Sequence, residues 1–370
     1  MSTESLREAS HQLAAAVDGV DWSLDAVKRA KGAISAALEG ASGAARDEAL
    51  EILVARLERA SVDDADGVAH VAIYAGVLVE KGASATKLGH VLLDKLPSVL
   101  VAARRFADAC LRDVPPPNDD DPADAKELLH VDGRAIPHEV FGAHKSSDPS
   151  GAAALARLKQ WVLPNVACLT RHRALLERAT KDAELRRVAA AMRRSDARWL
   201  HVLLGVLLGA EAIVLDPASG RGFRMVLDGI VSNFDLRALV EDALLERGLP
   251  GTRNPPDVLA VVRGDADTAS RTYVTGAFNL YTYRGAQFDV GSPKDIPLVD
   301  WIWNEGVPDD VPRIDGKLVV LVGRQGPRRT WDLGRSFSAL RARVDVAEEL
   351  AKGEVDAWLA RCRAAAEDAV

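Results

Sequence analysis

The stretch WLHVLLGVLLGAEAIVLDPASGRGFRMVLDGI, residues 199–230, decides the fold, because the character of the chain changes within it. Its first half is a nearly continuous apolar run interrupted by His201 and Glu211, which indicates a buried helix leading into a buried strand rather than a membrane span. Residues 212–216 and 223–230 then predict two strands joined by a tight turn. Helices are expected before this stretch and a sheet after it.

Residues 1–112 are expected to form a helical bundle. Ser23 is placed to cap a helix whose apolar residues recur every three or four positions. Residues 66–82 are apolar on nearly all sides and predict the central helix, whereas Pro97 is expected to kink or break the helix that follows. Because no segment repeats at a fixed period, a bundle is preferred to an array of helical repeats. Farther on, Pro164 is expected in the first turn of a helix.

Residues 113–150 differ in composition from what precedes them. They begin with a proline-rich, acidic run without apolar periodicity, which predicts an exposed linker or loop. The segment HVDGRAIPHEVFGAH, residues 130–144, follows and holds three of the eight histidines. Two of these histidines are six residues apart, so on a helix they would diverge by about 240° and fail the H-E-x-x-H spacing of a zinc protease. Four residues remain as candidate metal ligands if a loop folds them around one ion: His130, Asp132, His138 and His144. The favoured interpretation is a polar connector without a metal.

Residues 151–370 predict an α+β domain that opens with helices and ends with a helical segment from about residue 345. Ser232 is placed to cap a helix, and the run KLVVLVG predicts a short buried strand. Gly220 and Gly222 fit a hairpin turn better than a phosphate-binding loop, because a strand rather than a helix is expected after them. Cys168 and His172 share a helical face, yet a core cysteine beside a peripheral histidine is the simpler interpretation.

Bulk composition narrows the class of protein. The net charge of -7 gives no overall attraction to nucleic acid, although it leaves local basic patches open. Three widely spaced cysteines are no disulfide framework, and the N-terminus lacks a secretory signal, so a cytoplasmic location is expected. Abundant Ala, Arg, Asp, Leu and Val are associated with GC-rich bacterial genomes.

Arginine gathers in two stretches, residues 171–198 and 324–343. If the two folded together, they would form a patch for phosphate or for an acidic partner, and the acidic residues 118–124 could cover it. The simpler interpretation is that these arginines solvate the outer faces of helices.

Tryptophan is concentrated near residue 300. Trp301 and Trp303 are two residues apart, so in a strand they would point the same way. Core packing is the leading interpretation, and an exposed surface that binds a protein is the second. The residues expected on such a surface are Trp301, Trp303, Trp331, Arg328, Arg329 and Arg335.

The sequence therefore predicts a predominantly α, α+β protein with an N-terminal helical bundle, a helical segment and a small mixed sheet. No motif names a reaction and no cofactor is expected. The first hypothesis is a cytoplasmic interaction protein, acting as scaffold, adaptor or regulator, with an unknown protein partner and no membrane association. The alternatives are a metal-dependent hydrolase using the 130–144 cluster and a binder of phosphate ligands or nucleic acid through the arginine patches.

Overall fold

A computed structural model describes most of the chain. The described residues are 3–18, 22–114, 129–268, 273–274, 276–283, 301–304, 306–324, 329–330 and 335–367. They form two compact units, Met1–Leu204 and Gly205–Val370, called unit 1 and unit 2 below. The boundary lies inside the stretch where the sequence changes from helical to strand-forming, and the helices between residues 149 and 204 pack in unit 1. The acidic, proline-rich residues 115–128 lie outside the described part, so their expected exposure stays a prediction.

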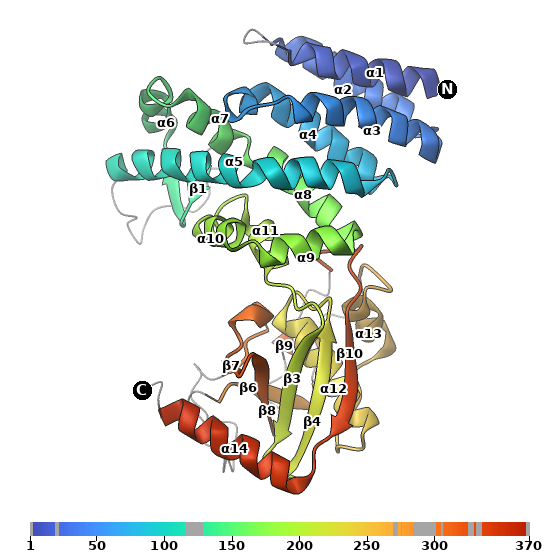
Figure 1. Ribbon diagram of the computed structural model, residues 1–370, viewed down its shortest axis with the longest axis vertical. Coiled ribbons are helices and arrows are strands. Elements are labelled where there is room, and N and C mark those ends of the chain that lie inside the picture. Colours follow the sequence, from blue (N-terminus) through green and yellow to red (C-terminus); the bar gives the residue numbers. More distant parts are fainter. Residues whose placement is uncertain are drawn as a thin grey trace. The chain divides into compact units, whose positions relative to one another are not determined.

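Unit 1 is a stack of helices (Figure 1). Helices α1 and α3 pack together, α2 packs on α1, α4 on α3, and α8 contacts both α4 and α5. The helix bounds are α1 Thr3–Ala16, α2 Leu24–Leu38, α3 Gly43–Glu58, α4 Ala65–Glu80, α5 Ala85–Asp113, α6 His138–Lys145, α7 Pro149–Ala156, α8 Leu158–Arg171, α9 Arg173–Lys181, α10 Ala183–Ala191 and α11 Arg198–Leu204. A short 3-10 turn, Val62–Asp64, precedes α4.

Local sequence signals explain several of these elements. Ser23 accepts a hydrogen bond from the backbone N–H of Ala26, as expected for the cap of α2. α4 is buried along most of its length, as its apolar composition predicts. Pro97 does not break α5, which runs through it, and the expected first-turn position of Pro164 is wrong, because α8 holds this proline in its interior. Both helices are buried against neighbours over several turns, and that packing compensates for the backbone hydrogen bond that each proline removes.

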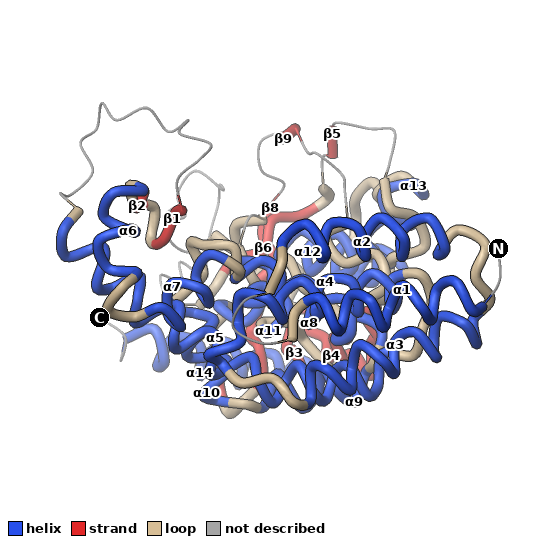
Figure 2. Tube along the Cα trace, turned by 90° about the horizontal axis from the view of Figure 1, so that it is seen from above, coloured by secondary structure: helices blue, strands red, loops and turns tan. Residues whose placement is uncertain are grey.

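The segment at 130–144 is ordered rather than an irregular connector. It forms a hairpin of β1 (Leu129–Val131) and β2 (Arg134–Ile136), followed directly by α6. Asp132 and Gly133 form the turn, with φ of 55° and 75°, so the left-handed backbone needed by a two-residue hairpin is supplied by residues suited to it. Gly142 and Pro137 do not prevent a helix here, because Pro137 precedes the first helical residue and one glycine costs too little to stop α6. All three elements lie at the C-terminal end of α5 (Figures 1 and 2).

Unit 2 is built on a mixed sheet with strand order β10-β4-β3-β8-β6, and β7 also pairs with β8. β3 and β8 are parallel, and the other pairs are antiparallel. The β3–β4 hairpin confirms the turn expected at Gly220 and Gly222. The bounds are β3 Ala210–Asp216, β4 Arg221–Asp228, β5 Tyr273–Val274, β6 Phe278–Tyr281, β7 Arg313–Ile314, β8 Lys317–Arg324, β9 Arg329–Thr330, β10 Arg343–Glu349, α12 Asn233–Glu246, α13 Pro256–Arg263 and α14 Lys352–Glu367. A 3-10 turn, Pro308–Asp310, lies before β7.

Helices cover both faces of this sheet. α12 and α13 close a larger core over one face, and α14 closes a smaller core over the other. The last helix was expected from about residue 345, but residues 343–349 form β10 and pair with β4. Val344 and Val346 alternate with polar residues, which is a strand pattern. It was missed because most residues of the segment are charged. The predominantly α, α+β fold class is confirmed.

Candidate functional site

Two tryptophans of unit 2 stack on each other beside β6, a strand at the edge of the sheet. Their ring centroids are 5.6 Å apart, with an angle of 24° between the ring planes. Trp301 is partly buried, meets the ring of Tyr281 edge to face, and packs against the smaller core. Trp303 is 38% exposed, among the most exposed large apolar side chains of the described residues. Trp301 is thus the inner ring, packed against the smaller core, and Trp303 is the outer ring, exposed to solvent.

The backbone that carries this pair is fixed at both sides. Ile302 donates its N–H to the carbonyl of Leu280 in β6. Asn233, the first residue of α12, donates its side-chain amide to the carbonyl of Trp303 at 2.8 Å. The backbone N–H of Asn233 also donates to the carbonyl of Gly306. Trp303 therefore belongs to a segment whose backbone is hydrogen-bonded to both β6 and α12.

Arg335, one of the three arginines expected to border the tryptophans, is not exposed. The side chain of Arg335 is only 2% exposed and donates hydrogen bonds to backbone carbonyls, among them that of Val262 at 2.6 Å. Arg335 thus ties the end of α13 to residues 337–340 and is a structural residue. Arg328 and Trp331 lie outside the described residues, as does the side chain of Arg329, so their roles stay predictions.

α12 carries a set of buried polar side chains that the sequence analysis did not single out. The buried polar residues of this helix are Asn233, Asp235, Arg237, Glu241 and Asp242. Glu241 is fully buried and accepts hydrogen bonds from Asn254 at 2.9 Å and from the backbone N–H of Phe278 at 3.1 Å. Burial raises the pKa of Glu241, and the nearby Arg237 opposes that rise. Glu241 therefore joins the helix to the first residues of β6.

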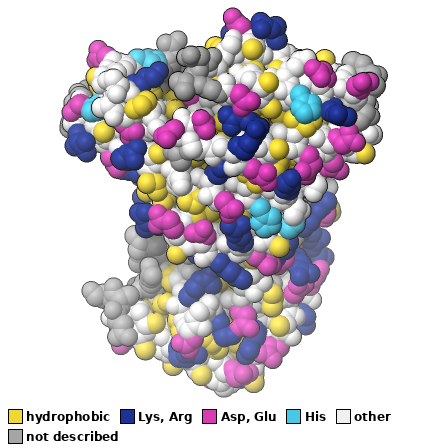
Figure 3. All heavy atoms as spheres, turned by 45° about the horizontal axis from the view of Figure 1, so that its top comes forward, with side chains coloured by type: hydrophobic (Ala, Val, Ile, Leu, Met, Phe, Trp, Pro, Cys, Tyr) yellow, Lys and Arg dark blue, Asp and Glu magenta, His cyan; other side chains and the backbone are white. Residues whose placement is uncertain are grey.

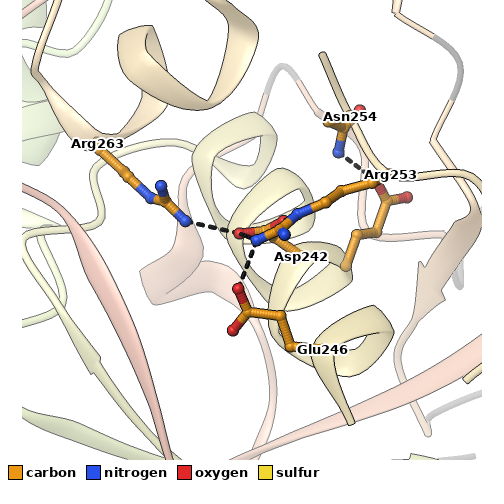
Figure 4. A network of polar contacts seen from close by, with 6 residues as sticks. Asp242, Glu246, Arg253, Asn254 and Arg263 are labelled. Carbon is orange, nitrogen blue, oxygen red and sulfur yellow. Dashed lines mark hydrogen bonds and ion pairs between the residues drawn. The ribbon is translucent and has the colours of Figure 1, made fainter. Parts of the chain in front are cut away.

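Asp242, next in the chain, sits at the centre of a second network (Figure 4). It accepts from Arg253, with one contact at 3.0 Å, and from Arg263 at 2.6 Å, and Arg253 also reaches Glu246. The network borders an open groove of about 350 Å³ between α12, the end of α13 and the start of β10. The two other arginines of this groove are paired as well, Arg341 with Asp265 and Arg343 with Asp228 and Asp345. Because each guanidinium has a carboxylate partner, the groove is poorly suited to capture phosphate.

The four candidate metal ligands at 130–144 do not converge. Asp132 forms an ion pair with Arg104 at 2.7 Å, and His144 contacts Asp113 at 2.7 Å. His130 lies on β1, and His138 and His144 are at opposite ends of α6. No group of three or more His, Cys, Asp or Glu side chains in the described part of the chain is arranged to hold a metal ion. The geometry therefore gives the hydrolase alternative no support.

The arginines of residues 171–198 lie in unit 1, and several are engaged. Arg173 pairs with Glu177, Arg178 with Asp94, and Arg187 with Glu184. Figure 3 shows basic and acidic side chains interspersed over the visible face, without a broad region of one sign. The pairing agrees with the simpler interpretation, in which arginines solvate helix faces.

Cys168 and His172 also have structural roles. Cys168 is fully buried, and burial raises the pKa of its thiol to about 12, so the thiol is protonated at neutral pH. His172 caps α9 by accepting the N–H of Leu175. Cys110 and Cys362 are likewise buried and free, as expected for a chain without a disulfide framework.

Comparison with known proteins adds no assignment: the chain matches no protein-family model, no curated protein and no solved structure. Among the described residues, no helix has the length and apolar character required to cross a bilayer.

Proposed function

We propose that this chain is a protein-interaction protein of the bacterial cytoplasm, acting as a scaffold, adaptor or regulator, and that unit 2 binds a partner protein through Trp303. The observation that carries the proposal is the stacked pair, in which a buried tryptophan supports an exposed one. Tryptophan is the residue type most enriched among those that dominate binding energy at protein interfaces.

The fixed backbone strengthens this proposal. An aromatic side chain that is already positioned loses little conformational entropy on binding, so more of its contact energy contributes to affinity. Asn233 and Leu280 hold the segment on either side of Trp303. By contrast, the described geometry supports neither a metal centre nor an unpaired arginine patch. It therefore gives no comparable support to the metal-dependent hydrolase or to the binder of phosphate ligands or nucleic acid.

The test uses two tryptophans of matched exposure. Trp303 is 38% exposed and Trp199, in α11 of unit 1, is 40% exposed. The tagged full-length chain and its Trp303→Ala and Trp199→Ala variants are expressed in the source cells and cross-linked, and the proteins recovered with each are quantified by mass spectrometry. A partner that binds through Trp303 should be lost from the first variant by tenfold or more, since such residues contribute at least about 2 kcal/mol, and retained by the second.

The thermal midpoint separates binding from folding. An interface tryptophan should leave the midpoint of Trp303→Ala within a few degrees of the parent chain, whereas a core tryptophan would cost about 3–5 kcal/mol. Equal recovery of every partner by both variants, or a drop of many degrees in Trp303→Ala, contradicts the proposal.

A further inference from the structure

Unit 1 contains a partly buried lysine whose amine is surrounded by two side chains of α4 and by Arg157, which lies between α7 and α8. The Nζ atom of Lys31, on α2, lies 2.9 Å from Nδ1 of His70. It also lies 5.4 Å from the centroid of the Tyr74 ring, and Arg157 is a neighbouring positive charge. The amine is therefore surrounded by an imidazole, an aromatic face and a second cation rather than by a carboxylate.

The imidazole beside Lys31 is built into the core. His70 is 5% exposed, its ring meets that of Trp22 edge to face at 5.4 Å, and its Nε2 has no hydrogen-bond partner. Burial, followed by the charges of Lys31 and Arg157, lowers the pKa of His70 to about 4, and Asp66 only partly opposes them. His70 is thus neutral at neutral pH and adds no positive charge beside the amine.

The carboxylate nearest this cluster is already engaged. Asp66 accepts from Nε of Arg157 at 2.7 Å. Burial and the charge of Arg157 both lower the pKa of the Lys31 amine. A lysine desolvated beside another cation has a larger fraction of free amine at neutral pH, which is how proteins prepare lysine as a nucleophile.

We infer that Lys31 is a nucleophilic amine that forms an imine with small aldehydes or ketones carrying an apolar or aromatic group, with His70 positioned to relay the proton. The nitrogen lone pair attacks the carbonyl carbon while the C=O π electrons move to oxygen. The nitrogen then transfers one proton to Nδ1 of His70, which passes it to the oxygen and gives the carbinolamine. The second nitrogen proton reaches the oxygen by the same route as the C–O bond breaks, so the oxygen leaves as water and a C=N bond remains. The ring of Tyr74, whose centroid lies 5.4 Å from Nζ, is the apolar face that such a carbonyl compound would contact.

The experiment compares two lysines of one helix. Lys28 lies three residues before Lys31, has a 66% exposed side chain and lies 3.9 Å from Asp25, so it is the more accessible of the two. The full-length chain is incubated with benzaldehyde and sodium cyanoborohydride at several pH values, and benzylation of each lysine is followed by mass spectrometry. Lys31 should react several-fold faster than Lys28 at pH 7, and its rate should reach a plateau at a lower pH, because a lowered pKa leaves a larger fraction of free amine at neutral pH.

Two variants test which neighbouring group makes the Lys31 amine reactive. Arg157→Gln removes the neighbouring cation and should move the pH profile of Lys31 toward that of Lys28. His70→Phe keeps an aromatic ring but removes Nδ1, and should slow Lys31 several-fold without changing Lys28. Equal rates and pH profiles for Lys31 and Lys28 in the parent chain overturn the inference whether or not either variant folds.

Discussion

α4 in unit 1 and α12 in unit 2 are both buried helices, but they are buried in different ways. α4 places one polar side chain among its buried residues, His70, and the rest are apolar or glycine. α12 buries polar and charged side chains together with its leucines, and their partners come from residues 253–254, 263, 277–278 and 335. Apolar composition therefore predicted the burial of α4, whereas the burial of α12 depends on partners distant in the sequence.

The comparison separates two physical routes to a buried helix. An apolar helix gains free energy from the area it removes from water. A charged helix must replace the water around each group by hydrogen bonds, and any group left unpaired costs stability. α4 should therefore be sensitive to changes in volume, and α12 to the loss of single polar partners.

The largest expected effect is at Glu241. Glu241→Ala leaves Asn254 and the N–H of Phe278 without their acceptor and should destabilise unit 2 by about 3–5 kcal/mol. Glu241→Gln, which keeps the shape and one acceptor oxygen, should cost less. Urea unfolding followed by thiol labelling reports each unit separately, because Cys362 is buried in unit 2 and Cys168 in unit 1. If Glu241→Ala exposed Cys168 at a lower urea concentration than Cys362, the prediction that this change destabilises unit 2 would be wrong.

A smaller effect is expected where α4 meets α8. A Cβ at Gly76 would lie 2.7 Å from Cβ of Pro164 and 2.8 Å from its Cα, so Gly76→Ala should cost about 1–3 kcal/mol through overpacking. The control is Gly32→Ala on α2, where no atom lies within 4 Å, and this change should stabilise the helix by about 0.5–1 kcal/mol. Thermal midpoints of both variants measure the difference, and a Gly76→Ala chain as stable as the parent would show that the two helices can separate.

The smallest effects are expected from pH, and they have opposite signs in the two units. The pKa of His70 is lowered from 6.5 to about 4 in the folded chain. On acidification the unfolded chain therefore binds a proton at this histidine before the folded chain does, and unit 1 loses stability between pH 6.5 and 4. Burial raises the pKa of Asp235 from 3.8 to about 6, against the opposing charge of Arg335. The folded chain therefore keeps a proton that the unfolded one loses, and unit 2 gains stability as pH falls from 6 to 3.8.

Each group should change the stability of its unit by at most about 1.4 kcal/mol per pH unit within its range. The measurement is the difference in urea midpoint between the parent and a variant lacking the group, His70→Phe for unit 1 and Asp235→Asn for unit 2. The labelling reagent is a pyridyl disulfide that reacts with thiols in acid. Differences that are flat with pH, or that change in the same direction, would contradict the two assignments.

The candidate site was only partly accessible from sequence. The two-residue spacing of Trp301 and Trp303 predicted that their rings lie together, and they stack. Which ring faces solvent depends on the Tyr281 ring and on the smaller core, which are formed by residues elsewhere in the chain. Arg335 was expected at an exposed rim because charged side chains are usually exposed. It is buried instead, and it donates hydrogen bonds to the backbone carbonyls at the end of α13.

The sequence by itself determined the features that depend on short spacing: the α+β class, the Ser23 and Ser232 caps, the apolar helix α4 and the β3–β4 hairpin. These features follow from periodicity and from hydrogen bonds between near neighbours. Tertiary structure alone decided whether a helix continues through a proline and which charges are buried. Those outcomes depend on the free energy of packing and pairing with distant residues, which no local pattern records.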